Sequence, residues 1–334
     1  MPRLNRSDIV RHLLADRAAT PARAEGSAFA PSNIALCKYW GKRHEELNLP
    51  VTSSLSISLG ELGTRTRLRV IADADQVTLN GEPVPPHHAF ARGVTQFLNL
   101  FRAPGQCFAV DTINSIPTAA GLASSASGFA ALTLAVNDLF DWNLDQRTLS
   151  ILARLGSGSA SRSIFRGFVL WHAGAQGNGL DSFAEELPYQ WPDLRIGLLT
   201  LSAAEKAISS REAMKATKRG SLLYEAWPSK VAQDLSAIHD AIATGNFEQL
   251  GRTAESNALA MHATGLGAWP PVLFWLPETV ATLHRLWALR AEGLRAYCTM
   301  DAGPNVKLIF LAEDEAAVAA AFPAVKVVAP FAGT

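Results

Sequence analysis

One carboxylate in this sequence stands where a strand-end residue could perform acid–base chemistry. Asp301 follows an apolar stretch and precedes the sharp turn Gly303-Pro304-Asn305. A carboxylate at such a position, facing a cleft, is suited to act as a general base. An aspartate that only caps the turn through its own backbone bonds gives the same pattern, so these residues leave both interpretations open.

Cations that could hold an anion are concentrated in the segment NIALCKYWGKR. Lys38, Lys42 and Arg43 are interspersed there with Tyr39 and Trp40. Ammonium and guanidinium groups beside aromatic rings and hydroxyls could line a polyanion pocket. The same side chains could instead be surface cations whose alkyl stems cover a buried aromatic patch.

Two further segments combine hydroxyl groups with cations. GSGSASR, at 156–162, ends in Arg162, whose guanidinium could bind a phosphate through two hydrogen bonds. EKAISSREAM contains Lys206 and Arg211 and leads into a predicted helix. Taken alone, the first segment could be a flexible surface turn, and the second a helix N-cap with solvated charges.

The segment PTAAGLASSASG, at 117–128, could bind phosphate where a helix begins. Small residues allow the backbone to approach a ligand closely, and the first turn of the following helix offers unpaired N–H groups. The hydroxyls of Ser124 and Ser125 suit phosphate oxygens or a magnesium ion. A small-residue helix entry that merely allows close packing is the alternative.

The elements expected around these segments are a mixture of strands and helices. The hydrophobic pattern predicts strands at 65–70, 107–114, 168–171, 194–201, 295–300 and 306–311, and helices at 146–155 and 280–289. Asn80-Gly81 predicts a hairpin turn, because both central residues tolerate positive φ. Strands, then helices, then strands again indicate an α+β fold rather than a doubly wound parallel sheet.

The composition narrows the possible functions. A chain of 334 residues with a hydrophobic fraction of 48% predicts about two domains and a substantial core. The 30 basic residues balance the 30 acidic ones, so any anion must be bound by a local cluster of cations. Three widely spaced cysteines argue against a disulfide framework. No signal-peptide pattern or membrane-spanning run is present, so we expect a cytoplasmic protein without nucleic-acid or membrane partners.

Common catalytic motifs are absent or incomplete. Gly41-Lys42 lacks the earlier glycine and the following hydroxyl residue of a Walker A loop. The segment 156–161 lacks the third glycine of a dinucleotide fingerprint, and no HExxH or GxSxG motif occurs. The usual hydrolase and dehydrogenase chemistries are therefore poorly supported.

Taken in order, these blocks resemble those of the mevalonate diphosphate decarboxylases, which belong to the galactokinase–homoserine kinase–mevalonate kinase–phosphomevalonate kinase (GHMP kinase) superfamily. The matching blocks are NIALCKYWGKRHEELNLPVTSSLS, INSIPTAAGLASSASG, GSGSASRSIFRGFVLW, the MHAT that begins at Met261, and TMDAGPNVK. They span roughly residues 30–310 and agree with the family in spacing and order.

The resemblance implies the GHMP kinase fold, with a ribosomal-protein-S5-like N-terminal domain and a ferredoxin-like C-terminal domain on either side of a cleft. We expect an N-terminal extension at 1–27, an ATP- and substrate-binding domain at 28–195, and the ferredoxin-like domain at 196–334. The family also implies a homodimer.

The implied activity is the ATP- and magnesium-dependent decarboxylation of (R)-5-diphosphomevalonate to isopentenyl diphosphate, ADP, phosphate and carbon dioxide, through phosphorylation of the C3 oxygen. Asp301 matches the catalytic carboxylate, with Lys42 and Asn33 beside it and Arg162 in the same catalytic set. The implied substrate-binding residues are Tyr39, Trp40, Gly41, Lys42, Ser157, Gly158, Ser159, Ala160, Ser161, Arg162 and Arg211. The implied ATP-binding residues are Pro117, Ala120, Gly121, Leu122, Ala123, Ser124, Ser125 and Lys206, with Ser124 and Ser125 also as magnesium ligands.

Three positions depart from the family pattern. Gln76 stands where the family usually has an arginine that helps to hold the substrate diphosphate, so 5-phosphomevalonate becomes an alternative substrate. Trp269 replaces a small residue and Leu155 a glutamine, and the residues offer no explanation for either. A mevalonate-type 3-kinase and a catalytically silent ligand-sensing protein are further alternatives. ADP and carbon dioxide, measured together for each acid, would separate these possibilities.

Overall fold

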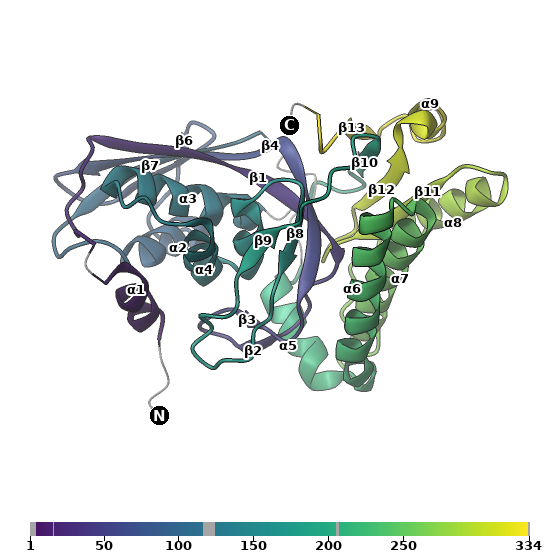
Figure 1. Cartoon of the computed structure of the whole chain (residues 1–334), viewed down its shortest axis with the longest axis horizontal. Coiled ribbons are helices and arrows are strands. Elements are labelled where there is room, and N and C mark those ends of the chain that lie inside the picture. Colours follow the sequence, from purple (N-terminus) through teal and green to yellow (C-terminus); the bar gives the residue numbers. More distant parts are fainter. Residues whose placement is uncertain (1–4, 16, 116–123, 205–206, 333–334) are drawn as a thin grey trace.

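The structure is a computed structural model of the chain and describes residues 5–15, 17–115, 124–204 and 207–332, with Ser124 described by its backbone alone. Two β-sheets, each with its own helices, form the two ends of an elongated molecule (Figure 1). The chain passes from the first sheet to the second between β9 (Ala184–Glu186) and β10 (Leu194–Leu199). Mixed strands and helices confirm the α+β prediction.

One long strand, β4, organises the first sheet. The strands of this sheet are β1 (Glu25–Cys37), β4 (Ser54–Ile71), β5 (Gln76–Leu79), β6 (Glu82–Pro83), β7 (Cys107–Asn114), β8 (Phe168–Trp171) and β9. β4 pairs antiparallel with β1 along most of its length, with β7 near its C-terminal end and with β8 near its N-terminal end. We predicted only 65–70 of this strand. The other half begins with SLSISL, in which serines alternate with apolar residues, and these serines are buried as fully as the apolar residues between them.

Helices cover one face of the first sheet (Figure 1). They are α2 (Ala89–Leu98), α3 (Ser124–Phe140), α4 (Gln146–Gly156) and the 3-10 helix η1 (Gly158–Ile164). α3 packs directly on β1. A Cβ atom at Gly26 would lie 2.2 Å from the carbonyl oxygen of Ala135, so strand and helix approach too closely for a side chain.

A small hairpin, β2 (Lys42–His44) and β3 (Leu49–Pro50), lies beside the first sheet and carries a predicted site residue. The N-terminal helix α1 (Arg6–Leu14) docks against it. Ile9 and Val10 of this helix belong to the same buried apolar cluster as Leu47 and Leu49. Arg6 Nε donates a hydrogen bond to the Glu46 carbonyl oxygen at 2.7 Å. Part of the N-terminal extension therefore packs against the hairpin and is hydrogen-bonded to it.

The second sheet is antiparallel, in the order β11-β12-β10-β13. Its other strands are β11 (Ala296–Met300), β12 (Val306–Leu311) and β13 (Lys326–Val328). The helices of this half are α5 (Ser210–Gly220), η2 (Leu222–Ala226), α6 (Trp227–Thr244), α7 (Phe247–Leu266), α8 (Pro277–Ala291), η3 (Ala312–Asp314) and α9 (Glu315–Ala321). α7 and α8 both pack against β11.

A single apolar cluster joins the two halves. It contains Ile34 and Ile57 of the first sheet, Ile196 of the second sheet, Val231 of α6 and Met261 of α7. Burial of apolar surface stabilises this junction by about 25 cal/mol for each Å² removed from water. The predicted domain boundaries remain predictions. The apolar cluster contains residues from both sides of the predicted boundary between residues 195 and 196.

Several predicted elements have the expected bounds. The strands at 107–114, 168–171 and 306–311 agree exactly with β7, β8 and β12, and the helix at 146–155 agrees with α4 within one residue. Asn80 and Gly81 have φ values of 54° and 87°, as a two-residue hairpin turn requires. These elements are the ones whose pattern depends on neighbours within a few positions.

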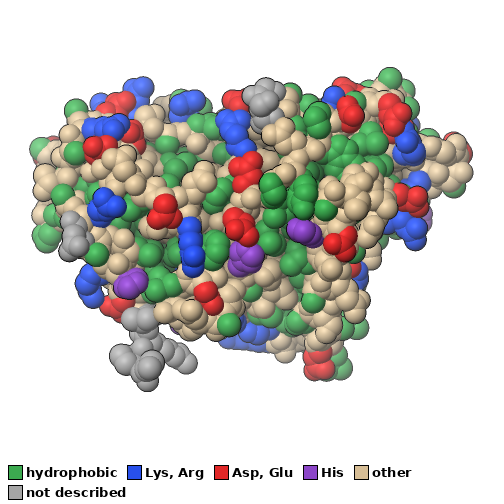
Figure 2. All heavy atoms as spheres, in the orientation of Figure 1, with side chains coloured by type: hydrophobic (Ala, Val, Ile, Leu, Met, Phe, Trp, Pro, Cys, Tyr) green, Lys and Arg blue, Asp and Glu red, His purple; other side chains and the backbone are tan. Residues whose placement is uncertain are grey.

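The face of the molecule drawn in Figure 2 carries no single dominant charge. Figure 2 shows acidic and basic side chains interspersed on one face, in agreement with the balanced composition. Cys37, Cys107 and Cys298 have free thiols. Within the described residues, no helix is both long and apolar enough to cross a bilayer.

Candidate active site

Asp301 directly follows β11 and contacts two ammonium groups. The Nζ atom of Lys38 lies 2.9 Å from its Oδ1, and the Nζ atom of Lys307 lies 3.4 Å from its Oδ2. The side chains of both lysines are almost fully buried, whereas that of Asp301 is 26% exposed. The two cations therefore fix the orientation of a carboxylate that remains accessible from the cavity described below.

The positions of three strands bring these two lysines close to Asp301. Lys38 is the first residue after β1, and Lys307 lies opposite Thr299 on the paired strands β11 and β12. Burial lowers the pKa of Lys38, and the neighbouring Asp301 opposes this shift. Lys38 Nζ also donates to the Ala35 carbonyl oxygen at 2.8 Å. A buried ammonium costs several kcal/mol unless it is paired, so Asp301 and these lysines depend on each other.

Two helices of the second half hold this group in place. The backbone N–H of Lys38 donates to Asn257 Oδ1 at 2.8 Å, and Asn257 Nδ2 donates to Asp234 Oδ2 at 2.7 Å. His262 is hydrogen-bonded to the backbone of Asp301, and burial lowers the pKa of this imidazole to about 3. It is therefore neutral at physiological pH and serves here as a fixed support rather than a proton donor.

Arg162 is held by neutral oxygen atoms. Its Nε donates to Asn33 Oδ1 at 3.2 Å, and its Nη1 donates to Ser54 Oγ at 2.6 Å. Asn33 Nδ2 in turn donates to Ser163 Oγ at 2.8 Å. Arg162 belongs to η1, which is mostly buried, so the flexible surface turn considered for GSGSASR is wrong. The small residues of this segment pack closely against the first sheet and α3.

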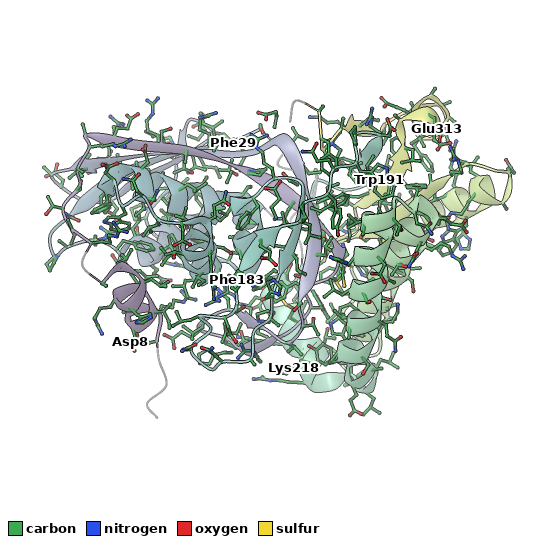
Figure 3. All side chains as sticks on the ribbon, viewed as in Figure 1. Asp8, Phe29, Phe183, Trp191, Lys218 and Glu313 are labelled. Atoms are coloured by element: carbon green, nitrogen blue, oxygen red, sulfur yellow. The ribbon has the colours of Figure 1, made fainter. Side chains whose placement is uncertain are left out.

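Lys42 is the buried cation of the hairpin. Its Nζ donates to Asn48 Oδ1 at 2.6 Å. Burial, together with the nearby Arg211, lowers the pKa of Lys42 to about 8. Lys218 of α5, labelled in Figure 3, donates to the Lys42 carbonyl oxygen at 2.8 Å. The burial of Lys38 and Lys42 shows that the surface-cation interpretation is wrong for these two lysines, whereas Arg43 is exposed and does not line the cavity.

The N-terminus of α5 brings a further cation to the site. Ser209 caps this helix by accepting from the Glu212 N–H, and the Glu212 side chain accepts from the Ser209 N–H. Arg211, in the first turn, has an exposed side chain. The N-cap interpretation of EKAISSREAM is therefore confirmed, and the same residues also reach the cavity.

These side chains surround one cavity of about 420 Å³. Its lining includes the predicted residues Asn33, Tyr39, Trp40, Lys42, Ser125, Ser157, Gly158, Ser159, Arg162, Arg211 and Asp301. It does not include Gly41, Ala160 or Ser161. Gly41 makes a turn with φ +110°, with its backbone against the Tyr224 hydroxyl, and Ala160 and Ser161 are fully buried behind the lining.

Part of the predicted nucleotide site cannot be located. Pro117, Ala120, Gly121, Leu122, Ala123 and Lys206 lie outside the described residues, as does the side chain of Ser124. Ser125 is described, and its Oγ lies 3.5 Å from Ser157 Oγ. A second, mostly apolar cavity of about 170 Å³ also reaches Ser125. It is lined by Leu79, Phe90, Val94, Thr112, Asn114, Ser125, Gly128, Phe129 and Leu132.

The ion pairs of Asp301 involve lysines other than Lys42. Lys42 and Asp301 line the same cavity, and the ammonium groups that pair with this carboxylate belong to Lys38 and Lys307. The chain turns at Gly41 after β1, and this turn carries Lys42 into the hairpin. A sequence signal for Lys307 exists, because a single cation within the apolar strand VKLIFL must find a buried partner.

The departures from the family pattern have different outcomes. Gln76 is exposed at the beginning of β5 and does not line the cavity, so the inference of a lost phosphate contact loses its support. Leu155 is fully buried, and its carbonyl oxygen accepts from Asn48 Nδ2. Trp269 is 85% exposed, and nothing in the structure explains it.

The donors present fit a magnesium ion that arrives with phosphate groups. Among the described residues, no cluster of three or more His, Cys, Asp or Glu side chains could hold a metal. Magnesium usually keeps few protein ligands and binds the oxygens of substrate phosphates and water. Ser125, at the junction of the two cavities, supplies a hydroxyl of the kind that such an ion accepts.

Comparison with known proteins agrees with this geometry. The diphosphomevalonate decarboxylase-like N-terminal domain matches residues 30–184, and the mevalonate 5-diphosphate decarboxylase C-terminal domain matches residues 196–329. Diphosphomevalonate decarboxylase of Aspergillus fumigatus is 36% identical over 319 residues, which cover 89% of this chain and 79% of that protein.

Solved structures give the same result. A structure of MDDEF in complex with MVAPP, AMPPCP and magnesium is 41% identical, with a TM-score of 0.86, over 91% of this chain and 96% of that one. The mevalonate diphosphate decarboxylase from Enterococcus faecalis is 39% identical, with a TM-score of 0.84 and the same coverage. This likeness confirms the predicted GHMP kinase fold. With both halves matched and the whole fold shared, the chain belongs to the diphosphomevalonate decarboxylase family.

Proposed function

We propose that this chain catalyses the ATP-dependent decarboxylation of (R)-5-diphosphomevalonate, giving isopentenyl diphosphate, ADP, phosphate and carbon dioxide. The observation that carries this proposal is the cavity of about 420 Å³, whose described lining has one carboxylate, Asp301, and the cations Lys38, Lys42, Arg162 and Arg211. A small acid with a carboxylate and two phosphoryl groups carries several negative charges, which such a lining neutralises. The names and ligands of the matched relatives support the same reaction.

Asp301 acts on the C3 hydroxyl. It accepts the hydroxyl proton while the C3 oxygen bonds to the terminal phosphorus of ATP and the bond from that phosphorus to the ADP oxygen breaks. Lys38 and Lys307 favour the ionised carboxylate and hold its orientation. Phosphoryl transfer depends mainly on positioning and charge neutralisation, which makes a fixed carboxylate among cations suitable for this step.

Decarboxylation follows because phosphorylation turns the hydroxyl into a leaving group. Phosphate departs with the electrons of the C3–O bond. The electron pair between C2 and the carboxylate carbon becomes the C2=C3 double bond, and carbon dioxide is released. Arg162 and Lys42 are bound by neutral oxygens in the protein, so their charges are available to the carboxylate and phosphates of the substrate.

ATP is proposed to span the two cavities. The smaller cavity is apolar and suits a nucleotide base, and its junction with the larger one at Ser125 suits the phosphates. Ser125 would help to hold magnesium, which supplies charge neutralisation for the phosphate groups when bound. ATP and magnesium in the matched complex support this assignment, since AMPPCP resembles ATP.

We also propose that the protein is a cytoplasmic homodimer, as the family resemblance implies. The cavity is lined by residues of one chain, which is compatible with each subunit acting independently. Size-exclusion chromatography with light scattering tests the assembly, and a mass of one chain would contradict the dimer. Fractionation of cells that express the protein tests the compartment.

The decisive experiment compares acids under one condition. The protein is incubated with ATP, magnesium and either diphosphomevalonate, 5-phosphomevalonate or mevalonate, and ADP and carbon dioxide are measured together. We expect equal amounts of both products with the diphosphate, and much less with the others. Preferential turnover of the monophosphate, or ADP without carbon dioxide, would contradict the proposal in favour of the alternative decarboxylase or a 3-kinase. Absence of both products would indicate a silent binding protein.

A further inference from the structure

Lys42 differs from the lysines at Asp301 in the chemistry of its partner. Its ammonium is bound at 2.6 Å by the amide oxygen of Asn48, whereas Lys38 and Lys307 pair with a carboxylate. The nearest carboxylate oxygen, on the half-exposed Glu45, lies 3.9 Å from Lys42 Nζ. A neutral amide holds an ammonium without cancelling its charge.

Both polar atoms of the Asn48 side chain are hydrogen-bonded within the protein. Asn48 is buried and lines the cavity. Its Nδ2 donates to the carbonyl oxygens of Arg154 at 2.8 Å and Leu155 at 3.2 Å. Because carbonyls can only accept and an ammonium can only donate, these partners determine which end of the amide faces Lys42.

Asn48 also connects two parts of the cavity wall. Arg154 and Leu155 lie at the C-terminal end of α4, and Ser157 of the lining follows this helix directly. One buried amide therefore joins the hairpin that carries Lys42 to the segment that carries Ser157. A change in the length or charge of the Asn48 side chain would therefore disturb both the hairpin and the segment that carries Ser157.

We propose that Asn48 is a positioning residue, which fixes the Lys42 ammonium in the cavity and leaves its charge to the substrate anion. This inference rests on the proposed function and adds a residue to it. The alternative is a role in the turn alone, because Asn48 has φ +52° between β2 and β3. Asparagine is one of the residues that adopts this left-handed conformation without great strain.

Two substitutions separate these roles. Asn48→Gly keeps the left-handed backbone and removes the amide, and we expect the KM for diphosphomevalonate to rise about tenfold while the KM for ATP stays the same. Asn48→Asp keeps the shape of the side chain but places a negative charge beside Lys42. The aspartate also cannot donate to the two carbonyl oxygens, so the KM for diphosphomevalonate should rise further than in Asn48→Gly. A role in the turn alone predicts an unchanged KM in both variants.

A matched control is available at another left-handed asparagine. Asn143 has φ 51°, is exposed, and bonds to Asp141 in a turn before α4. Asn143→Gly removes the same side chain from the same backbone conformation outside the cavity. It should leave the KM for the acid unchanged, and thermal unfolding of all variants checks that each is folded.

A double-mutant cycle tests whether Asn48 acts through Lys42. In a Lys42→Met background, Asn48→Gly should change the KM by less than about twofold, because the group it positions is gone. The same fold-change in both backgrounds would overturn the inference.

Affinity for inorganic diphosphate, measured by calorimetry, provides a readout that does not need turnover. We expect Asn48→Gly to lose affinity about tenfold, and unchanged affinity would overturn the inference. Wild-type protein that binds diphosphate but releases no carbon dioxide would contradict the proposed function, while the comparison of affinities would still decide the role of Asn48.

Discussion

The buried cations in and beside the cavity fall into two regions, which differ in the partners that hold the charged groups. In the first region, Lys38 and Lys307 share the carboxylate of Asp301, so much of their charge is satisfied within the protein. In the second region, Lys42 and Arg162 are held by neutral amide and hydroxyl oxygens. All four side chains are buried, so the difference lies in their partners rather than in their exposure.

This difference in partners suggests different roles for the two regions, one in turnover and one in substrate binding. Burying a charge without a counter-charge costs several kcal/mol, and a folded protein normally pairs it. In the second region no carboxylate is hydrogen-bonded to Lys42 or Arg162, and the nearest one to Lys42, on the half-exposed Glu45, lies 3.9 Å away, which favours binding of an anion. We therefore expect changes in the first region to affect turnover and changes in the second region to affect substrate affinity.

The largest effect is expected at the centre of the first region. Asp301→Asn removes the proton acceptor, so carbon dioxide release should fall about 1,000-fold while substrate affinity, measured by calorimetry, stays within a few-fold. Asp73→Asn, an exposed position between β4 and β5, is the control. Near-normal turnover of Asp301→Asn would remove this carboxylate from the mechanism.

Arg162→Gln tests the second region. Loss of the guanidinium should raise the KM for the acid about 100-fold, or about 2.7 kcal/mol, because a buried cation no longer meets the substrate anion. Arg166→Gln is the matched control, since Arg166 is exposed and pairs with Glu61. Unchanged affinity in Arg162→Gln would assign Arg162 to structure alone.

Lys307→Met tests the first region at a cation that pairs with Asp301. Lys307 does not line the cavity but contacts Asp301, so kcat should fall about tenfold with little change in KM. Lys307→Arg, which keeps the charge, should recover part of kcat. Lys326→Met, at an exposed position of β13, serves as the control. A rise in KM without loss of kcat would break the distinction between the two regions.

The pH dependence of binding reports on Lys42. Its pKa is lowered to about 8, so the ammonium that attracts the anion is present below that pH and is lost above it. The KM for the acid should therefore rise several-fold between pH 7 and pH 9. Lys42→Arg should abolish this rise, because a guanidinium stays protonated. The same rise in Lys42→Arg would assign it to another group.

The smallest effect is expected outside both regions. Gln76→Arg should leave the ratio of kcat/KM values for the diphosphate and monophosphate acids within about twofold, because Gln76 does not line the cavity. The measurement is a direct comparison of the two acids with wild type and variant. A clear shift towards the diphosphate would show that this position reaches the substrate.

Local patterns in the sequence were sufficient for many elements and for part of the site. Asn33, Arg162, Arg211 and Asp301 were predicted and line one cavity. The unpredicted half of β4 shows the limit, because the serines of SLSISL are buried as fully as the apolar residues between them, and the sequence alone does not show what covers them. Catalytic roles for these residues remain predictions until the variants are measured.

Pairing across the cavity could not be predicted in the same way. Lys38 and Asp301 are 263 positions apart, and their contact depends on how the end of β1 packs against β11. Asn48 was overlooked because an asparagine in a turn has an ordinary local explanation. Its second role became visible only with the carbonyls of α4 beside it.

The family, the order of the phosphate-compatible segments and the α+β class follow from residue types and their spacing along the chain. Which cations share Asp301, and which keep their charge for a ligand, depends on the folded structure. The physical reason is that the state of a buried charge depends on the atoms within a few Å of it. Those atoms come from strands and helices that only the packing of the two sheets brings together.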